Sequence, residues 1–306
     1  MTESERLFGV ELEFSLTDND GRPVLQSAAP AVADGRAAGL QVATEQGSFQ
    51  IELNPGPWPL TPTGIEAGMS ELRRQTKCLS AIARRYELVL RPCAMPPILD
   101  PALIVDERFV TSHARYQAFA KYFASHSATL RFASGEALVF PGERAIACIN
   151  EIHVHISLGT QAATLALFRN LNEGGSEFAS KFLDRPVVNG KPVIGDYPTL
   201  QLFQEANFEL SPDGTMNRVG FLPVSVATFD DYMNAVRDFP AIPGVAGGEH
   251  LAQEQTVYFW VRMRKENERL RLEYRPMDMC ESWEERVRTF LDATLDLAGP
   301  PNGHNA

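Results

Sequence analysis

The sequence has 306 residues, of which 44% are hydrophobic and 22% are charged, and its formal net charge at pH 7 is −11. These proportions are those of an ordinary folded protein, and they exclude wholesale disorder, collagen and a coiled coil. The negative charge argues against nucleic acid and anionic membranes as partners, and no run of about 18 apolar residues could span a bilayer.

The N-terminal residues lack a basic segment followed by an apolar one, so we expect no signal peptide and a cytoplasmic protein. The four cysteines, at positions 78, 93, 148 and 280, are scattered and form no CxxC pair. This spacing favours reduced and mostly buried thiols. No change in composition marks a linker, so we predict one domain over 1–306, with a frayed tail at 299–306. The sequence is compatible with a homo-oligomer.

Apolar periodicity and turn residues divide the first half of the chain into strands and helices. In chain order we predict a strand at 7–16, one or two strands within 40–53, a helix at 63–86, an extended stretch at 87–91, a loop at 92–101, a helix at 112–124 and strands within 128–140. Thr63 is expected to cap the helix 63–86, because Glu66 follows three residues later as in a capping box.

The second half of the chain ends in a predicted hairpin and a helix. In order we predict a long strand at 145–158, a helix at 160–172 that ends at Gly174-Gly175, irregular loops over a site at 183–224, a helix at 228–239, a hairpin of 255–264 and 269–276, and a last helix at 282–297. Strands in tight hairpins, with helices grouped between them, favour an α+β fold over a parallel βαβ sheet.

Four of the predicted strands carry charged residues on one face. Side chains alternate along a strand, so residues two positions apart share a face. The four polar faces are Glu11 and Glu13; Gln50 and Glu52; Glu151, His153, His155 and Ser157; and Arg269, Arg271, Glu273 and Arg275. A polar strand face can simply meet water. Such faces usually mix Thr, Ser, Lys and Gln, whereas these four use almost only Glu, His and Arg.

Carboxylates crowded on one face need cations. Neighbouring carboxylates on a strand face are roughly 7 Å apart and repel by roughly 2.4 kcal/mol at an effective dielectric constant of about 20. Several carboxylates with a histidine form the ligand set of Mg²⁺ or Mn²⁺, and arginine is the residue type that holds phosphate. Together they indicate a nucleoside triphosphate and phosphoryl transfer, although the chain has neither a Walker motif nor GxGxxG.

The four strands resemble the carboxylate-amine ligase superfamily of glutamine synthetase and γ-glutamylcysteine ligase. The motifs that carry the resemblance are GVELEF at 9–14, Gln50 and Glu52 within GSFQIELNPGP, HVHIS at 153–157, and RLEYR at 271–275 followed by PMD. The segment RYQAFAKYF at 115–123 is similar to RYxxMxxYF of the glutamate-cysteine ligase family 2 branch. The glycine-rich segment that precedes HxH in glutamine synthetase is absent, because residues 148–152 are CINEI.

The resemblance implies a curved, mainly antiparallel sheet like that of the glutamine synthetase catalytic domain, with helices on its convex face and the active site on its concave face. It also implies roles for individual residues. Glu13, Glu45 and Glu52 would hold one divalent ion; Glu11, His153 and Glu273 would hold a second; His155, Arg271 and Arg275 would contact the phosphates of ATP, with the two arginines catalytic; and Arg115 would bind substrate.

The implied reaction is ATP-dependent and requires Mg²⁺ or Mn²⁺. The γ-phosphate of ATP passes to a glutamate-like carboxylate, and an amine attacks the resulting acyl phosphate to form an amide or γ-glutamyl-type bond with release of ADP. A carboxylate base is expected near the amine, for which Glu205 and Glu209 are candidates.

Further interpretations stay open from the residues alone. His153, His155 and Glu273 could bind Zn²⁺ or Fe²⁺ in a metal-dependent hydrolase or oxygenase, although the remaining carboxylates and arginines have no role in that scheme. The chain could also be a catalytically silent binding subunit. The two histidines could be hydrogen-bonded core residues. Glu45 could be a solvated turn residue, and Arg115 a surface helix residue.

Overall fold

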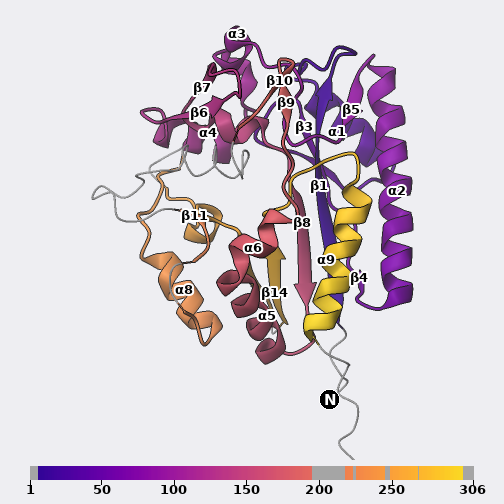
Figure 1. Ribbon diagram of the computed structural model, residues 1–306, viewed down its shortest axis with the longest axis vertical. Coiled ribbons are helices and arrows are strands. Elements are labelled where there is room, and N and C mark those ends of the chain that lie inside the picture. The colour runs from indigo at the N-terminus through magenta and orange to yellow at the C-terminus, as the bar shows by residue number, and fades with distance from the viewer. Residues whose placement is uncertain (1–5, 195–217, 223–224, 245–248, 268, 299–306) are drawn as a thin grey trace, which may run out of the picture.

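A large antiparallel sheet organises the chain (Figure 1). We describe a computed structural model, which covers residues 6–194, 218–222, 225–244, 249–267 and 269–298. The eight strands of the sheet are β1 (Leu7–Thr17), β2 (Val42–Thr44), β3 (Gln50–Leu53), β4 (Trp58–Pro59), β5 (Val89–Arg91), β8 (Ile152–Ser157), β13 (Val261–Glu266) and β14 (Arg269–Tyr274). Their order is β13-β14-β8-β1-β3-β2, and β4 and β5 also pair with β1.

Three short strand pairs lie outside this sheet. They are β6 (Ser127–Arg131) with β7 (Ala137–Pro141), β9 (Val187–Val188) with β10 (Lys191–Pro192), and β11 (Val219–Gly220) with β12 (Tyr258–Phe259). The helices are α1 (Ala28–Ala37), α2 (Pro62–Arg85), α3 (Pro101–Ile104), α4 (Ala114–Tyr122), α5 (Gln161–Glu173), α6 (Gly175–Ser180), α8 (Phe229–Arg237) and α9 (Trp283–Ala298), with 3₁₀ turns at Glu107–Phe109, Gly142–Cys148 and Gln253–Gln255.

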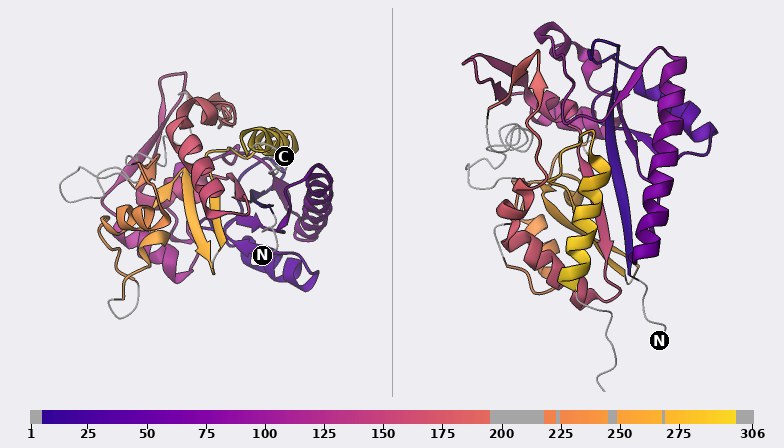
Figure 2. Two further views of the ribbon diagram at one scale, coloured as in Figure 1. Left: turned by 90° about the horizontal axis from the view of Figure 1, so that it is seen from below. Right: turned by 45° about the vertical axis from the view of Figure 1, so that its right-hand side comes forward.

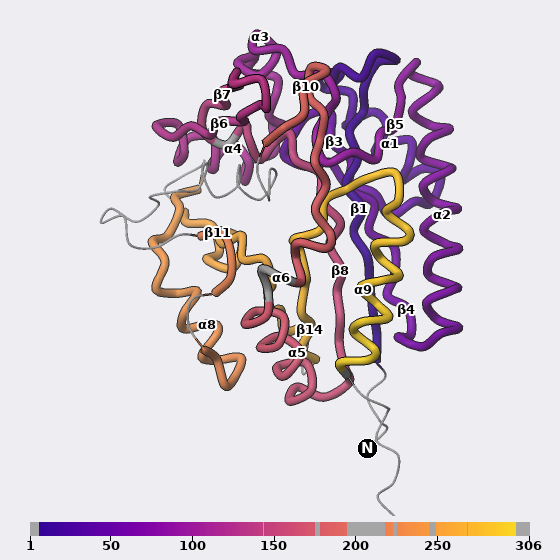
Figure 3. Tube along the Cα trace, viewed as in Figure 1, coloured from indigo at the N-terminus to yellow at the C-terminus, as the bar shows by residue number. Residues whose placement is uncertain are grey.

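The apolar faces of the strands form the core together with the helices. Val10, Leu12 and Phe14 of β1 are at most 1% exposed and belong to one cluster with Val154 of β8 and Leu272 of β14. Helices α5 and α9 contact the central strands, and α2 contacts β4 and β5. Figure 2 and the trace in Figure 3 show these helices alongside β1, β8 and β14. Because side chains alternate along a strand, burying one face leaves the charged residues together on the other.

Most predicted elements are present, and three local differences have clear causes. Helix α2 is capped by Thr61 rather than Thr63, because the Thr61 hydroxyl accepts a hydrogen bond from the Gly64 N–H at 3.1 Å. Pro62 occupies the first turn, where a backbone N–H has no partner within the helix and its absence from proline costs nothing. Glu66 does not close a capping box but pairs with Arg288 of α9. The capping-box prediction for Thr63 and Glu66 was therefore wrong.

The predicted strand at 145–158 is shorter than expected, because residues 142–148 form a 3₁₀ turn and β8 begins only at Ile152. Helix α1 was not predicted, because its buried residues are only Ala28, Ala31, Val32 and Gly35 and its apolar periodicity is weak. No helix among the described residues is long and apolar enough to cross a membrane. The prediction of one domain is not tested. Of the irregular loops predicted at 183–224, residues 195–217 and 223–224 lie outside the described residues, and the described part contains the short strands β9, β10 and β11, which were not predicted.

Candidate active site

The register of four adjacent strands brings the charged faces together. Glu11 of β1 lies directly opposite His153 of β8, and Glu13 lies opposite Glu52 of β3. On the other side of β8, His155 lies opposite Glu273 of β14. Residues directly opposite in an antiparallel pair have their Cβ atoms about 5 Å apart on the same face. The four separate polar faces are therefore one continuous surface.

This surface lines a cavity of about 250 Å³, the main cavity. Its lining residues are Glu11, Glu13, Glu45, Gln46, Gln50, Glu52, Arg115, Tyr116, Ile146, Ile149, Glu151, His153, His155, Tyr258, Arg262, Arg264, Arg271, Glu273 and Arg275. All of the predicted site residues outside the 183–224 loops are among them. Glu205 and Glu209, the candidate bases, lie outside the described residues.

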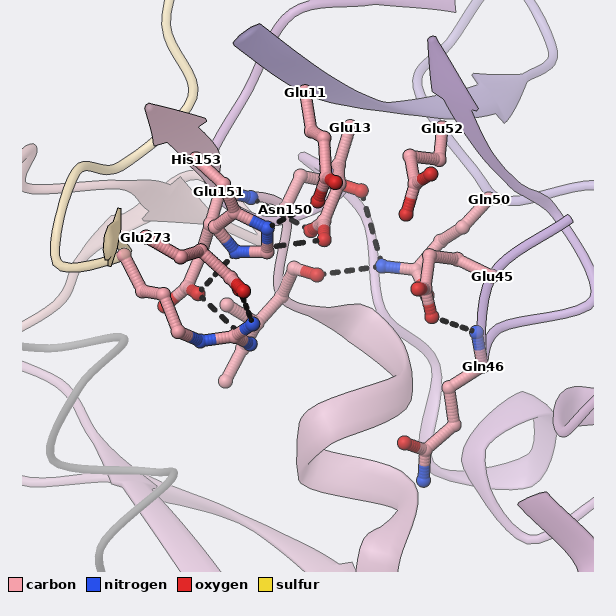
Figure 4. Close-up of polar contacts among 12 residues, drawn as sticks. Glu11, Glu13, Glu45, Gln46, Gln50, Glu52, Asn150, Glu151, His153 and Glu273 are labelled. Atoms are coloured by element: carbon pink, nitrogen blue, oxygen red, sulfur yellow. Dashed lines mark hydrogen bonds and ion pairs between the residues drawn. The ribbon is translucent and has the colours of Figure 1, made fainter. Parts of the chain in front are cut away.

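The Glu11 set consists of Glu11, His153 and Glu273, which each offer a ligand atom within 4.8 Å of the others (Figure 4). Nδ1 of His153 lies 3.0 Å from Oε2 of Glu11. Burial disfavours ionised Glu11, but hydrogen bonds and charges from His153 and His155 outweigh it and hold the Glu11 pKa below its ordinary value. One nitrogen and two carboxylates at this spacing fit a small divalent cation.

The Glu13 set consists of Glu13, Glu45 and Glu52, whose ligand atoms also lie within 4.8 Å of one another. Burial, together with the charges of Glu45 and Glu151, raises the pKa of Glu13 to about 8. Burial and the neighbouring carboxylates raise the pKa of Glu52 well above its ordinary value. Three crowded carboxylates, of which Glu13 and Glu52 resist ionisation, are the arrangement expected of an oxygen-ligand cation site.

Glu45 is held at the cavity by two hydrogen bonds rather than left in a solvated turn. Its Oε2 accepts the backbone N–H of Gln46 at 2.8 Å and the hydroxyl of Tyr116 at 2.7 Å. The turn that carries Glu45 is tied down by Gln50, which accepts from the Gly47 N–H at 2.7 Å. The Gln50 amide also donates to the Ile149 carbonyl at 2.6 Å, on the segment that leads into β8.

Two buried arginines share the carboxylate of Glu273. Arg275 donates from Nη1 to Glu273 Oε1 at 2.6 Å, and Arg262 of β13 pairs with the same oxygen. Burial disfavours the charge on Glu273, but the two arginines outweigh it and hold the Glu273 pKa well below its ordinary value. Arg275 also has Nη2 3.9 Å from Glu151 Oε2. In this structure Arg275 therefore already has an ion-pair partner on the sheet.

The remaining predicted phosphate contacts lie at one side of the main cavity. Nε2 of His155 is 2.8 Å from Glu11 Oε1, an ion-pair distance without the alignment of a hydrogen bond. Arg271, with a side chain 36% exposed, lies 3.2 Å from Glu266 and opposite Arg264 of β13. Arg264 therefore adds a further cation beside Arg271.

A side cavity adjoins the main one and shares Glu11, His155 and Arg271 with it. Its remaining lining residues are Leu7, Phe8, Gly9, Val10, Asn54, Pro55, Gly56, Pro57, Ser157, Glu266 and Arg269. More of its wall is apolar, and it opens where β1, β8 and β14 run side by side. The main cavity is therefore mostly charged and the side cavity is more apolar, and Arg271 and His155 lie between them.

Arg115 lies at the helical wall of the main cavity rather than within either carboxylate set. Its guanidinium donates to the Gln255 carbonyl at 3.2 Å and lies 5.7 Å from the ring centres of Tyr116 and Phe119. The side chain is thus held against α4 at the edge of the cavity, where a substrate could reach it.

Several lining residues had no role predicted from the sequence. Glu151 shares the polar face of His153 and His155, which was a usable indication. Arg262 and Arg264 alternate in the predicted strand 255–264, but placing them needs the hairpin register, in which Arg262 faces Glu273 and Arg264 faces Arg271. Tyr116 belongs to the RYQAFAKYF segment but had no predicted role, and Tyr258 and Gln46 had no recognisable pattern.

Comparison with known proteins agrees with the geometry. The family model described as Glutamate-cysteine ligase family 2 matches residues 7–295. No curated protein matches the sequence. Among solved structures, glutamate-cysteine ligase from Francisella tularensis in complex with AMP is 13% identical, with a TM-score of 0.59, over 98% of this chain and 68% of that one. A bifunctional glutathione synthetase from Pasteurella multocida is 15% identical, with a TM-score of 0.56, over 95% of this chain.

This chain spans only 38% of the length of the Pasteurella protein. At such low identities the two structures establish the fold, and they confirm the predicted α+β arrangement around a curved, mainly antiparallel sheet. Because the family model matches residues 7–295 of 306, the chain belongs to glutamate-cysteine ligase family 2.

Proposed function

We propose that this protein is an ATP-dependent ligase that joins a glutamate-like carboxylate to an amine, forming an amide or γ-glutamyl-type bond with release of ADP and phosphate. The observation that carries the proposal is the pairing of two three-ligand sets, the Glu11 set and the Glu13 set, in one cavity with arginines on its wall. Membership of glutamate-cysteine ligase family 2 supports it.

Each ligand set would hold one Mg²⁺ or Mn²⁺ ion. The donors fit these ions because five of the six are carboxylates, which are hard oxygen ligands. When bound, the ions would supply positive charge that neutralises the negative charge building on the phosphate during transfer. Glu13 and Glu52, whose pKa values are raised by burial and crowding, would lose their protons as the site fills.

The positive groups would orient the phosphates. His155, Arg271 and Arg275 lie on neighbouring strands of the same face, and Arg275 retains N–H donors beyond the one it gives to Glu273. The shared position of His155 and Arg271 suits a nucleotide whose phosphates enter the main cavity while its nucleoside occupies the side cavity. Apolar walls such as Phe8 and Pro55 would cover the base.

Arg115 would bind the carboxylate of the acid substrate at the opposite wall. Its fork of N–H donors matches a carboxylate, and its contact with the rings of Tyr116 and Phe119 limits its rotation. With the acid anchored there, the reacting carboxylate would face the γ-phosphate, and the acyl phosphate would form between Arg115 and Arg275. The amine would then attack the activated carbonyl, and phosphate would leave.

A hydrolase or oxygenase built on His153, His155 and Glu273 is less well supported. Among the described residues, the ligand atoms that come together are those of Glu11, His153 and Glu273, and His155 is not in the set. The Glu13 set and the arginines would also have no role. The cytoplasmic location and the homo-oligomer remain predictions.

The test is a screen of amino acids and amines in pairs for ADP release with Mg²⁺. We expect one pair to yield ADP, phosphate and an amide in equal amounts, and no release without divalent cation. A Glu52→Gln variant assayed beside it excludes contaminating ATPase. AMP and pyrophosphate as products would contradict the acyl phosphate, and activity that follows tightly bound zinc or iron would favour the hydrolase or oxygenase.

A further inference from the structure

Glu151 is a buried carboxylate in the main cavity that neither ligand set contains. It lies in the segment CINEI, where the glycine-rich lead-in of glutamine synthetase is absent, and it is 3% exposed. Resting on the proposed function, we propose that Glu151 is a positioning residue: it accepts the Nε2 proton of His153 and thereby holds Nδ1 toward the cation of the Glu11 set.

The distances around His153 distinguish its two ring nitrogens (Figure 4). Nδ1 lies 3.0 Å from Oε2 of Glu11, which belongs to the ligand set. Nε2 lies 3.1 Å from Oε2 of Glu151 and 3.8 Å from Oε1 of Glu13, so Glu151 is the partner within hydrogen-bond distance. A histidine that binds a metal through one nitrogen commonly donates from the other to a carboxylate, which sets its tautomer and ring orientation.

Glu151 is itself held in place, mainly through its backbone. Its backbone N–H donates to Glu13 Oε2 at 2.8 Å, and its backbone carbonyl accepts from the Glu13 N–H at 3.1 Å. A further backbone bridge joins it to Asp278, and Arg275 Nη2 is 3.9 Å from its Oε2. His153 is only 3% exposed, so losing Glu151 would leave its buried Nε2 proton without this acceptor.

A buried carboxylate at this place could instead attract cations through its charge alone, or it could be a direct ligand. Each of these roles predicts a different response to substitution. Glu151→Gln keeps an acceptor oxygen but removes the charge, whereas Glu151→Leu removes both at similar volume. Glu136→Gln is the control for one lost charge, because Glu136 lies on the β6–β7 hairpin outside the main cavity and pairs with Lys191.

The experiment measures Mn²⁺ binding by electron paramagnetic resonance, without nucleotide or substrate, on the full chain and these variants. We expect Glu151→Leu to weaken binding of one ion about 10- to 100-fold, as is typical when such an outer carboxylate is lost. Glu151→Gln should lose much less, and Glu136→Gln should match the parent protein. Melting curves recorded in parallel identify any variant that fails to fold.

A second readout follows the imidazole directly. The protein is labelled with ¹⁵N-histidine, and its NMR spectrum is recorded with Mg²⁺. The signals of His153 are those that disappear in His153→Asn. In the parent protein and in Glu151→Gln, the His153 ring should carry its proton on Nε2. Glu151→Leu should lose this single tautomer. The measurement on the parent and Glu151→Gln tests the proposal even if Glu151→Leu does not fold.

Several results would overturn the inference. Equal weakening of Mn²⁺ binding in Glu151→Gln and Glu151→Leu would mean that only the charge of Glu151 matters. If these variants bound one Mn²⁺ ion fewer than the parent protein, Glu151 would be a direct ligand. A proton on Nδ1 of His153 would reverse the assigned orientation. Normal Mn²⁺ binding by Glu151→Leu would remove this inference alone, whereas a parent protein that binds no Mn²⁺ would remove the proposed metal centres as well.

Discussion

The hydroxyl of Tyr116 donates a 2.7 Å hydrogen bond to Oε2 of Glu45, which joins helix α4 to the Glu13 set. The neighbouring residue on the same helix is Arg115, the proposed anchor of the acid substrate. A single turn of helix therefore contacts both a carboxylate of the proposed metal site and the proposed substrate end of the main cavity. Placement of the acid and placement of one cation should depend on each other.

We predict that Tyr116→Phe weakens binding of one of two Mn²⁺ ions about tenfold, because Glu45 loses a donor that fixes its carboxylate and a hydrogen bond to a charged group contributes about 1.5–3 kcal/mol. Titration of the metal-free protein with Mn²⁺ measures this. Tyr86→Phe is the matched control, since Tyr86 donates to Asp34 at 2.9 Å on the exposed surface. Equal binding by the two variants would show that Glu45 needs no orientation by Tyr116.

We predict that Glu13→Gln and Glu52→Gln each abolish ligase activity without unfolding the protein. Each change removes a ligand, but it also removes repulsion among crowded carboxylates, so the melting temperature of the metal-free protein should stay the same or rise. Activity assays and melting curves test both statements. Glu284→Gln, on the surface of α9, serves as the control. Full activity in either site variant would exclude that residue from the centre.

We predict that the metal-free protein becomes less stable as the pH rises from about 5 to 8. The pKa of Glu13 is raised to about 8 in the fold, against about 4.3 in an unfolded chain, so the folded state binds the extra proton. The stabilisation from that proton is complete below the pKa of the unfolded chain and is lost as the pH rises through the pKa of the folded protein. Burial and opposing carboxylates likewise raise the pKa of Glu52, which acts in the same direction.

Chemical denaturation at several pH values measures this slope, and Glu13→Gln should reduce it. Excess Mg²⁺ should also reduce it, because a bound cation replaces the proton. His153 adds a decline in the upper part of the range: burial and Arg275 oppose its charge, but Glu11 and Glu151 outweigh them and raise its pKa to about 10. An identical slope in Glu13→Gln and the parent would assign the effect to other groups.

We predict that Arg275→Lys loses most of its kcat while the KM for ATP changes little. Lysine keeps the charge but cannot present a planar fork of donors to a transferring phosphate. The alternative is that Arg275 only pairs with Glu273 on the sheet. Arg262→Lys is the comparison, since Arg262 pairs with the same oxygen. Equal kcat losses in the two variants, each matching a lower melting temperature, would favour the structural role.

The sequence alone was sufficient to predict which residues line the main cavity on the four polar strand faces. Alternation along a strand is a local property of the backbone, so Glu11 and Glu13, or His153 and His155, had to share a face wherever their strands were placed. The order of the four motifs then identified the family, and the family implied the α+β sheet. These features depend on residues that are close in the sequence, which is why they could be predicted.

Only the tertiary structure decided which charged residues meet. Glu11 lies opposite His153, 142 residues away in the chain, because β1 and β8 are neighbours in one register, and a shift of one residue would turn the carboxylate to the other face. Register likewise places Arg262 opposite Glu273, whereas the packing of helix α4 brings Tyr116 to Glu45. Register depends on how all the apolar faces pack at once, and no local pattern contains that information.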